Sequence, residues 1–194
     1  LYILKMTKET KVNAAILIIG NEILSGRTQD TNTSTLATWL NSLGVKVGEV
    51  RVIPDIKETI ISTLNILRKT YNYVFTTGGI GPTHDDITAE AVSEAFGLKY
   101  EIHNEAYKIL ESYYKQGEFN KGRQKMVWMP SNANLILNPT SGAPGFNIEN
   151  VYCLPGVPSI LKSMLGGLKN SIVGGEPILS KTISLRTVES EIAE

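Results

Sequence analysis

The sequence predicts an α/β fold with three layers, in which helices cover both faces of a mainly parallel sheet. Short apolar segments alternate with longer segments of helical periodicity along most of the chain, an order typical of parallel sheets. Glycine or proline follows the apolar segments directly, as in "AAILIIG", "YVFTTGG" and "VYCLPG". Ligands in such folds bind beyond the carboxyl ends of the strands, so these loops mark one edge of the sheet as the expected site.

The N-terminal half predicts three strands and three helices. The continuous apolar run at 14–19 is typical of a strand buried on both faces. A segment that opens with Asp55 and carries Glu58 three residues later resembles a capping box at a helix start. Strands are predicted over 14–19, 45–53 and 71–77, and helices over 32–44, 54–70 and 86–97.

The C-terminal half continues the alternation with shorter segments. Pro158 stands near the start of the closing helix, where its missing N–H costs nothing. Helices are predicted over 104–117, 121–129 and 157–168, and strands over 134–139 and 151–156.

Composition limits the classes of partner. The 194 residues include 19 basic and 19 acidic side chains, a balance that gives no reason to expect nucleic acid or a membrane surface as a partner. The single cysteine, Cys153, lies in an apolar run and is predicted to be a small buried side chain. We therefore expect a cytoplasmic protein with an α/β domain at 11–172. Residues 173–194 are expected to form a linker and a C-terminal strand or extension that the chain does not complete.

The segment "TTGGIGPT" predicts a phosphate or pyrophosphate cradle. Gly78, Gly79 and Gly81 can take positive φ and let a ligand approach the main chain, and consecutive N–H groups in such turns hold anions. Thr77 and Thr83 add hydroxyl groups. The spacing matches neither the P-loop nor the dinucleotide fingerprint, and a tight turn that needs glycine is the alternative interpretation.

Three aspartates are candidates for metal chemistry. Asp85 and Asp86 precede a predicted helix, where one of them is expected to cap the first turn. Two carboxylates would repel a phosphate unless a divalent cation such as Mg²⁺ lay between them. Asp55 follows the second strand at the same edge of the sheet, and a helix cap is an equally good interpretation for it.

The remaining loops add polar candidates. In "GNEILSGRTQDTN" the side chains of Glu22 and Asp30 could contact a ligand, Arg27 could pair with an anion, and Asp30 or Asn32 could cap the next helix. In "NPTSGAPGF" Ser141 and Gly142 could touch a ligand or serve an ordinary turn.

The two histidines have different predicted roles. His84 lies inside the glycine–aspartate segment and could contact the ligand, whereas His103 is predicted to lie on the surface at a helix start. Neither histidine has the spacing of a zinc site.

Four segments taken together resemble a known family. The stretches "GNEILSGRTQDTN", "TTGGIGPTHDDITAEAV", "NPTSGAPGF" and "LPGVP" are similar to the molybdopterin-binding domain shared by MogA/MoaB-type molybdenum-cofactor proteins and CinA-type competence/damage-inducible proteins. The similarity spans roughly 14–168. The forms "GNEIL", "GGIGPTHDDIT" and "RTVESEIA" resemble the CinA-type branch.

The resemblance implies a homo-oligomer, dimer or trimer, that binds molybdopterin or a nucleotide with Mg²⁺. It implies catalysis at a phosphate bond, by molybdopterin adenylylation or by cleavage of an ADP-ribose-type pyrophosphate. Matched by position, Asp86 and Asp55 correspond to the catalytic aspartates, while Asp86 and Asp85 stay the metal candidates from the residues themselves. The matched ligand-binding positions are Gly78, Gly79, Gly81, Glu22, Asp30, Ser141, Gly142 and Gly145, and the hydroxyl groups of Thr77 and Thr83 are added from the glycine segment itself.

The sequence departs from the CinA-type pattern at two positions. Asn21 stands where that pattern has an aspartate, and Ile160 stands where it has a glutamate. These departures keep a second class of function open, a non-catalytic carrier of molybdopterin or nucleotide, or an oligomerisation module. The deamidase activity of full-length CinA-type proteins is not assigned to this chain.

Overall fold

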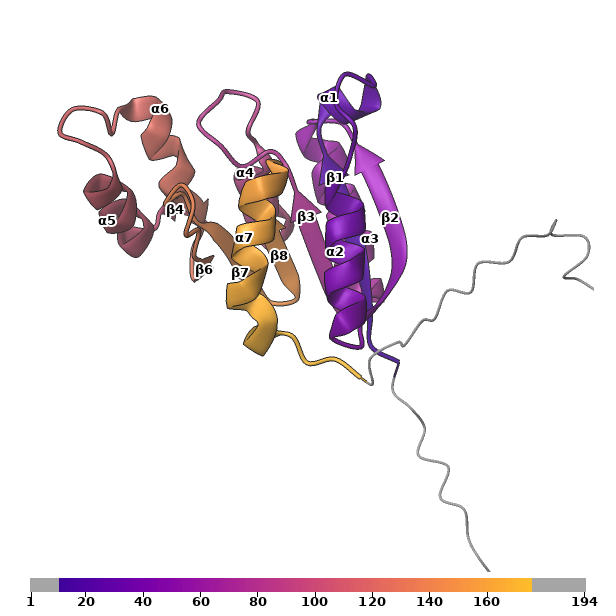
Figure 1. The fold of residues 1–194 in the computed structure, drawn as a ribbon. Coiled ribbons are helices and arrows are strands. Elements are labelled where there is room, and N and C mark those ends of the chain that lie inside the picture. The colour runs from indigo at the N-terminus through magenta and orange to yellow at the C-terminus, as the bar shows by residue number, and fades with distance from the viewer. Residues whose placement is uncertain (1–10, 176–194) are drawn as a thin grey trace, which may run out of the picture.

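A six-stranded sheet forms the centre of the computed structural model, which describes residues 11–175. Strands β2, β1, β3 and β8 are parallel, and β7 runs antiparallel to its neighbours β8 and β6 (Figure 1). The strands in sheet order are β2 Lys46–Ile53, β1 Asn13–Ile19, β3 Tyr73–Thr77, β8 Val151–Leu154, β7 Gly145–Ile148 and β6 Asn134–Ile136. The predicted α/β fold is confirmed. The predicted C-terminal extension from residue 176 onward lies outside the described residues.

Helices cover both faces of the sheet (Figure 1). Helices α2 (Asn32–Ser42) and α7 (Pro158–Leu168) lie in front of it in this view, and α3 (Lys57–Thr70) and α4 (Thr88–Ala95) lie behind. Helix α5 (Asn104–Tyr113) packs on the side of α3 and α4. Shorter turns complete the list, α1 Asn21–Leu24, α6 Lys121–Gln124, η1 Lys125–Val127 and η2 Lys169–Ser171.

Strand β1 supplies both layers of the core. Ile16 and Ile18 pack under α2 and α7, whereas Leu17 and Ile19 pack on the side of α3 and α4. A strand between two layers of helices must be apolar at every position, which explains the unbroken run in the sequence. Cys153 on β8 is completely buried, as predicted, and burial raises the pKa of its thiol to about 12.

Two parts of the fold differ from the sequence prediction. The predicted helix at 121–129 ends after α6 and η1, and its last residues form β5 (Trp128–Pro130), which pairs antiparallel with β4 (Tyr100–Ile102). The predicted loop at 138–146 ends earlier than expected, because strand β7 begins at Gly145 and runs to Ile148. Strand β5 takes its partner from distant sequence, whereas β7 forms a hairpin with the next strand, β8. Both strands are too short for local periodicity to reveal them.

The strand order places a switch point between β1 and β3. The chain leaves β1 through α2 on one face and returns from β2 through α3 on the other. At such a switch the loops that follow the two strands diverge and leave a crevice. No helix in the described residues is long and apolar enough to cross a membrane.

Gly145→Ala is expected to lower the free energy of unfolding by about 1–3 kcal/mol, the usual cost of overpacking a core. A Cβ atom at Gly145 would meet the carbonyl oxygen of Cys153 and lie 3.1 Å from Met164 Cε. Gly166→Ala in α7 is the matched control, because its Cβ would meet nothing within 4 Å. The control should gain up to about 1 kcal/mol from helix propensity. Urea denaturation of both variants checks this, and equal stabilities would contradict it.

Candidate functional site

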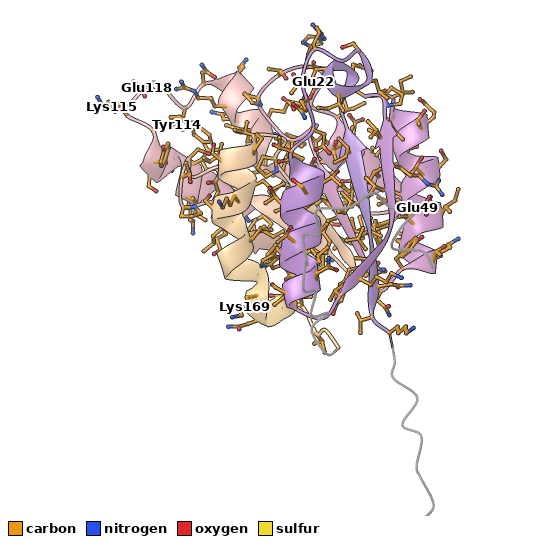
Figure 2. All side chains as sticks on the ribbon, turned by 45° about the vertical axis from the view of Figure 1, so that its right-hand side comes forward. Glu22, Glu49, Tyr114, Lys115, Glu118 and Lys169 are labelled. Carbon is orange, nitrogen blue, oxygen red and sulfur yellow. The ribbon has the colours of Figure 1, made fainter. Side chains whose placement is uncertain are left out.

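The loops after β1, β2, β3 and β8 gather at one end of the molecule. The segment that follows β3 forms a large loop at the top of Figure 1, between the α1 region and α6. In Figure 2 Glu22 lies at this end and Lys169 lies at the opposite one. The predicted site residues therefore share the carboxyl edge of the sheet.

The glycine loop begins at the end of β3, where Gly78 lies close to the ends of β1 and β8. Gly78 has a φ of 94° and Gly79 a φ of 64°, values that favour glycine. A Cβ atom at Gly78 would meet the carbonyl oxygen of Ile19, and one at Gly79 would meet Thr88 Oγ1. Gly81 has no positive φ, contrary to the prediction; its missing side chain instead leaves room for the carboxylate of Asp86.

The N–H groups of the loop differ in availability. Gly78 N–H donates to Leu154 O at 3.2 Å, so it is already paired with β8. Within the described residues no hydrogen bond is recorded from the N–H groups of Gly79, Ile80 or Gly81. Only the N–H groups at 79–81 are therefore free for the anion that the sequence predicts at this loop, within the part of the chain that the structure describes.

Asp85 and Asp86 meet at one hydroxyl group. Thr83 Oγ1 lies 2.6 Å from Asp85 Oδ1 and 2.5 Å from Asp86 Oδ2, and Thr83 N–H donates to Asp86 Oδ2 at 2.8 Å. The expected helix cap is wrong for both aspartates, because α4 begins at Thr88 without a side-chain cap. The carboxylates instead close the turn that leads into α4.

Lys125 is a site residue that sequence reasoning missed. Its Nζ donates to the carbonyl oxygen of Thr83 and lies 3.3 Å from that of His84. The pKa of Asp85 lies below its usual value, mainly because of the hydrogen bond from Thr83, with a smaller contribution from the positive charge of Lys125. Lys125 comes from η1, far along the chain, so no local motif could have shown this contact.

Asp55 lies at the same edge of the sheet, but its pKa is shifted in the opposite direction from that of Asp85. Burial raises its pKa above the ordinary value of 3.8, and the charges of Glu22 and Asp85 raise it further, while the hydrogen bond from Asn21 N–H opposes the shift. That bond is 2.8 Å long. The capping-box interpretation is wrong, since α3 has no side-chain cap and Asp55 holds α1 instead.

The acidic residues do not form a complete metal cage. Among the described residues no group of three or more His, Cys, Asp or Glu side chains could hold a metal ion. Mg²⁺ needs only one or two carboxylates when phosphate oxygens and water complete its shell. Asp85 and Asp86 share the single hydroxyl hydrogen of Thr83, so lone pairs remain on their oxygens and the pair fits such an ion.

A small polar pocket of about 50 Å³ lies at the β1–β3 switch point, with Glu22, Asp30, Asn32, Thr77 and Gly78 among its lining. Asp30 Oδ1 accepts from Asn32 N–H at 2.9 Å and Thr33 N–H at 3.3 Å, so it satisfies the first N–H groups of α2 from the position before the N-cap residue. Asn32 Nδ2 donates to Gly156 O at 2.8 Å, but its buried Oδ1 has no partner in the described structure.

Arg27 makes a local contact instead of the predicted anion contact, whereas His103 stands at a helix start as predicted. Arg27 Nε donates a hydrogen bond to Ser25 Oγ at 3.3 Å on the exposed first loop. His103 opens α5, where its Nδ1 accepts from Ala106 N–H at 3.3 Å.

A larger and mostly apolar pocket of about 170 Å³ lies on the other side of the glycine loop. Its lining joins Gly79, Gly81 and Asp86 to Ser141 of the late loop, and includes Ile160. Asn138 shapes the late loop by donating to Ser141 Oγ at 2.7 Å and to Ala143 O at 2.9 Å.

The structure brings Gly142 and Gly145 to neither pocket. Gly142 has a φ of 74° beside Tyr113, and Gly145 packs against β8.

A family model described as "Probable molybdopterin binding domain" matches residues 15–174. The chain belongs to this family. It is 37% identical over 160 residues to a CinA-like protein of Citrifermentans bemidjiense. The aligned region covers 79% of this chain and 39% of that relative. The chain therefore spans about two fifths of the relative's length.

Solved structures agree with this family. The CinA protein of Thermoplasma acidophilum, described as of unknown function, superposes with a TM-score of 0.77 at 31% identity, over 82% of this chain and 96% of that one. The molybdopterin biosynthesis enzyme MoaB of Thermus thermophilus shares the fold, with a TM-score of 0.55 at 18% identity. This superposition covers 83% of this chain and 91% of that one. The resemblance to the CinA-type branch is confirmed.

Asp55→Asn is expected to raise the free energy of unfolding at pH 7 by about 1 kcal/mol or less, because solvent screens this half-buried group. The folded-state pKa lies above the ordinary 3.8. The wild type therefore loses stability as pH rises from below 3.8 through the folded pKa, and the ionised carboxylate costs stability at every higher pH. An asparagine removes that charge and can still accept from Asn21 N–H.

Denaturation at pH 7 and at pH 3 checks this expectation. The higher free energy of unfolding of Asp55→Asn should be present at pH 7. It should be absent at pH 3, where the wild-type carboxyl group is protonated in both the folded and the unfolded state. Glu58→Gln, on the exposed first turn of α3, is the control and should show no such difference. A loss of stability at pH 7 in Asp55→Asn would contradict the assigned charge penalty.

Proposed function

We propose that the chain is a CinA-type enzyme that binds a phosphorylated pterin or a nucleotide with a divalent cation and acts at a phosphate or pyrophosphate bond. One observation carries the proposal. The N–H groups at 79–81 without recorded partners and the carboxylates of Asp85 and Asp86 lie on one loop. N–H groups attract phosphate oxygens, whereas carboxylates repel them, and a cation between the two resolves the conflict. The reaction would be molybdopterin adenylylation or hydrolysis of an ADP-ribose-type pyrophosphate.

The N–H groups at 79–81 would hold the phosphate and stabilise charge that develops on its oxygens. Lys125 of η1 adds a positive charge beside this loop, where its Nζ donates to the carbonyl oxygens of Thr83 and His84. Asp85 and Asp86 would hold Mg²⁺ or another divalent cation, which supplies electrostatic stabilisation of the phosphate oxygens when bound.

Asp55 would orient the attacking group. A carboxylate with a raised pKa accepts a proton more readily, and burial with two neighbouring acids gives Asp55 this property. Glu22, Asp30 and Thr77 would contact the rest of the ligand from the polar pocket, and Ser141 from the apolar one. Assembly into a dimer or trimer stays a prediction from the family resemblance.

Asp86→Asn is expected to reduce turnover at least about a hundredfold while ligand binding persists. The asparagine oxygen can still accept from Thr83 N–H, so the loop keeps its shape while it loses one charge. Turnover is measured on ADP-ribose, on FAD, and on ATP with molybdopterin, each with Mg²⁺, and binding by calorimetry. Glu58→Gln is the control.

Unchanged turnover in Asp86→Asn would remove Asp86 from the mechanism. If the wild type bound every substrate tightly but formed no product, the chain would be a carrier and not an enzyme. The departures at Asn21 and Ile160 keep this second hypothesis open. Absence of binding to all three would overturn the proposed function itself.

A further inference from the structure

The apolar pocket has an aromatic wall that no motif of the family segments contains. Trp128 on β5 and Tyr100 on β4 both line it, with ring centroids 5.4 Å apart at an interplanar angle of 48°. Trp128 is 38% exposed. Within the described residues no hydrogen bond is recorded from its indole N–H or from the Tyr100 hydroxyl. The two-stranded sheet thus presents an aromatic surface, with donors at its edge, beside the glycine loop.

The size of this pocket suits a ring and not a whole phosphorylated ligand. Sites that enclose drug-sized molecules are typically about 300–1,000 Å³, whereas an apolar cavity of about 150 Å³ holds a benzene ring. At about 170 Å³ this pocket falls near the second size. Its remaining walls include Met126, Phe146 and Ile160, so flat apolar faces are favoured and hydrated groups are not.

The polar groups lie where a ring with a phosphate attached would need them. Gly79 and Gly81 form one wall, with Asp86 and Lys125 beside them, so a phosphate on the loop is adjacent to the pocket. Ser141 Oγ accepts from Asn138 and keeps its own hydrogen for a ring nitrogen. Burial keeps the Tyr100 hydroxyl protonated, with its pKa raised to about 12.

We propose that this pocket is the subsite for the planar heteroaromatic ring of the ligand, and that Trp128 is the platform on which the ring stacks. The inference rests on the proposed function, because the phosphate of the same ligand occupies the loop at 79–81. It makes Trp128 a specificity-determining residue that separates ring-bearing phosphates from sugar phosphates. The polar pocket on the other side of Gly78 has no aromatic side chain in its lining, so it is the less suitable place for a ring.

The test compares adenosine 5′-monophosphate with ribose 5-phosphate, which share the sugar and the phosphate. By calorimetry the wild type should bind the nucleotide at least about tenfold more tightly, the scale of one stacked base. Trp128→Ala should remove that difference and leave ribose 5-phosphate binding unchanged, and Trp128→Phe should restore most of it. A variant that had merely lost its fold would bind neither compound and would show an altered melting curve, whereas Trp128→Phe keeps an aromatic ring.

Tryptophan fluorescence gives an independent readout, because the chain has only two tryptophans. Trp39 packs edge-on against Phe75 on the α2 side of the sheet, with ring centroids 5.9 Å apart. In Trp39→Phe the nucleotide should quench the emission of Trp128, and ribose 5-phosphate should not. In Trp128→Phe the nucleotide should leave the emission of Trp39 unchanged.

The outcomes separate this inference from the proposed function. Equal affinities of the wild type for the two phosphates, or equal weakening of both by Trp128→Ala, would overturn the ring subsite and leave the phosphate site in place. Quenching of Trp128 by adenosine as strong as by its monophosphate would support the ring subsite and contradict the phosphate cradle. Absence of any binding would overturn both.

Discussion

The site depends on how closely the chain at Gly78 approaches its two neighbouring strands. Its Cα lies against Ile19 O of β1 on one side and Gly156 on the other, and a Cβ on either glycine would meet backbone atoms there. Gly78 N–H is bonded to Leu154 O. The carboxyl ends of β1, β3 and β8 are therefore held together by main-chain contacts, and the functional side chains take their places around them.

This contact divides the edge of the sheet into two different surfaces. Toward β1 the chain leaves a small polar pocket, and toward β8 it leaves an apolar one. Thr88 fixes the loop between them by donating to Gly79 O from its N–H and to Gly78 O from its hydroxyl, at 2.9 and 3.1 Å. A ligand that crossed the loop at 79–81 would meet hydroxyl and carboxylate groups on one side and aromatic rings on the other.

Local sequence predicted those features that local physics determines. The burial of β1, the turn at Gly78 and Gly79 and the position of Asp55 at the sheet edge follow from apolar runs, glycine conformations and strand order. The roles of the aspartates did not follow, because carboxylates near a helix start can bind the next turn or the previous one. Lys125 and Trp128 lie in a segment predicted as one helix, but Lys125 falls in η1, and Trp128 begins β5, which pairs with β4. Both residues line the apolar pocket, a position that local spacing could not reveal.

If the N–H groups at 79–81 hold a phosphate, backbone amide NMR reports it at those three residues. On titration of the ¹⁵N-labelled chain with pyrophosphate and Mg²⁺, the amide resonances of Gly79, Ile80 and Gly81 should shift most. The resonance of Gly78 should shift little, because its N–H is already bonded to Leu154 O. Saturable shifts confined to other loops, with the resonances of 79–81 unchanged, would show that the phosphate binds elsewhere.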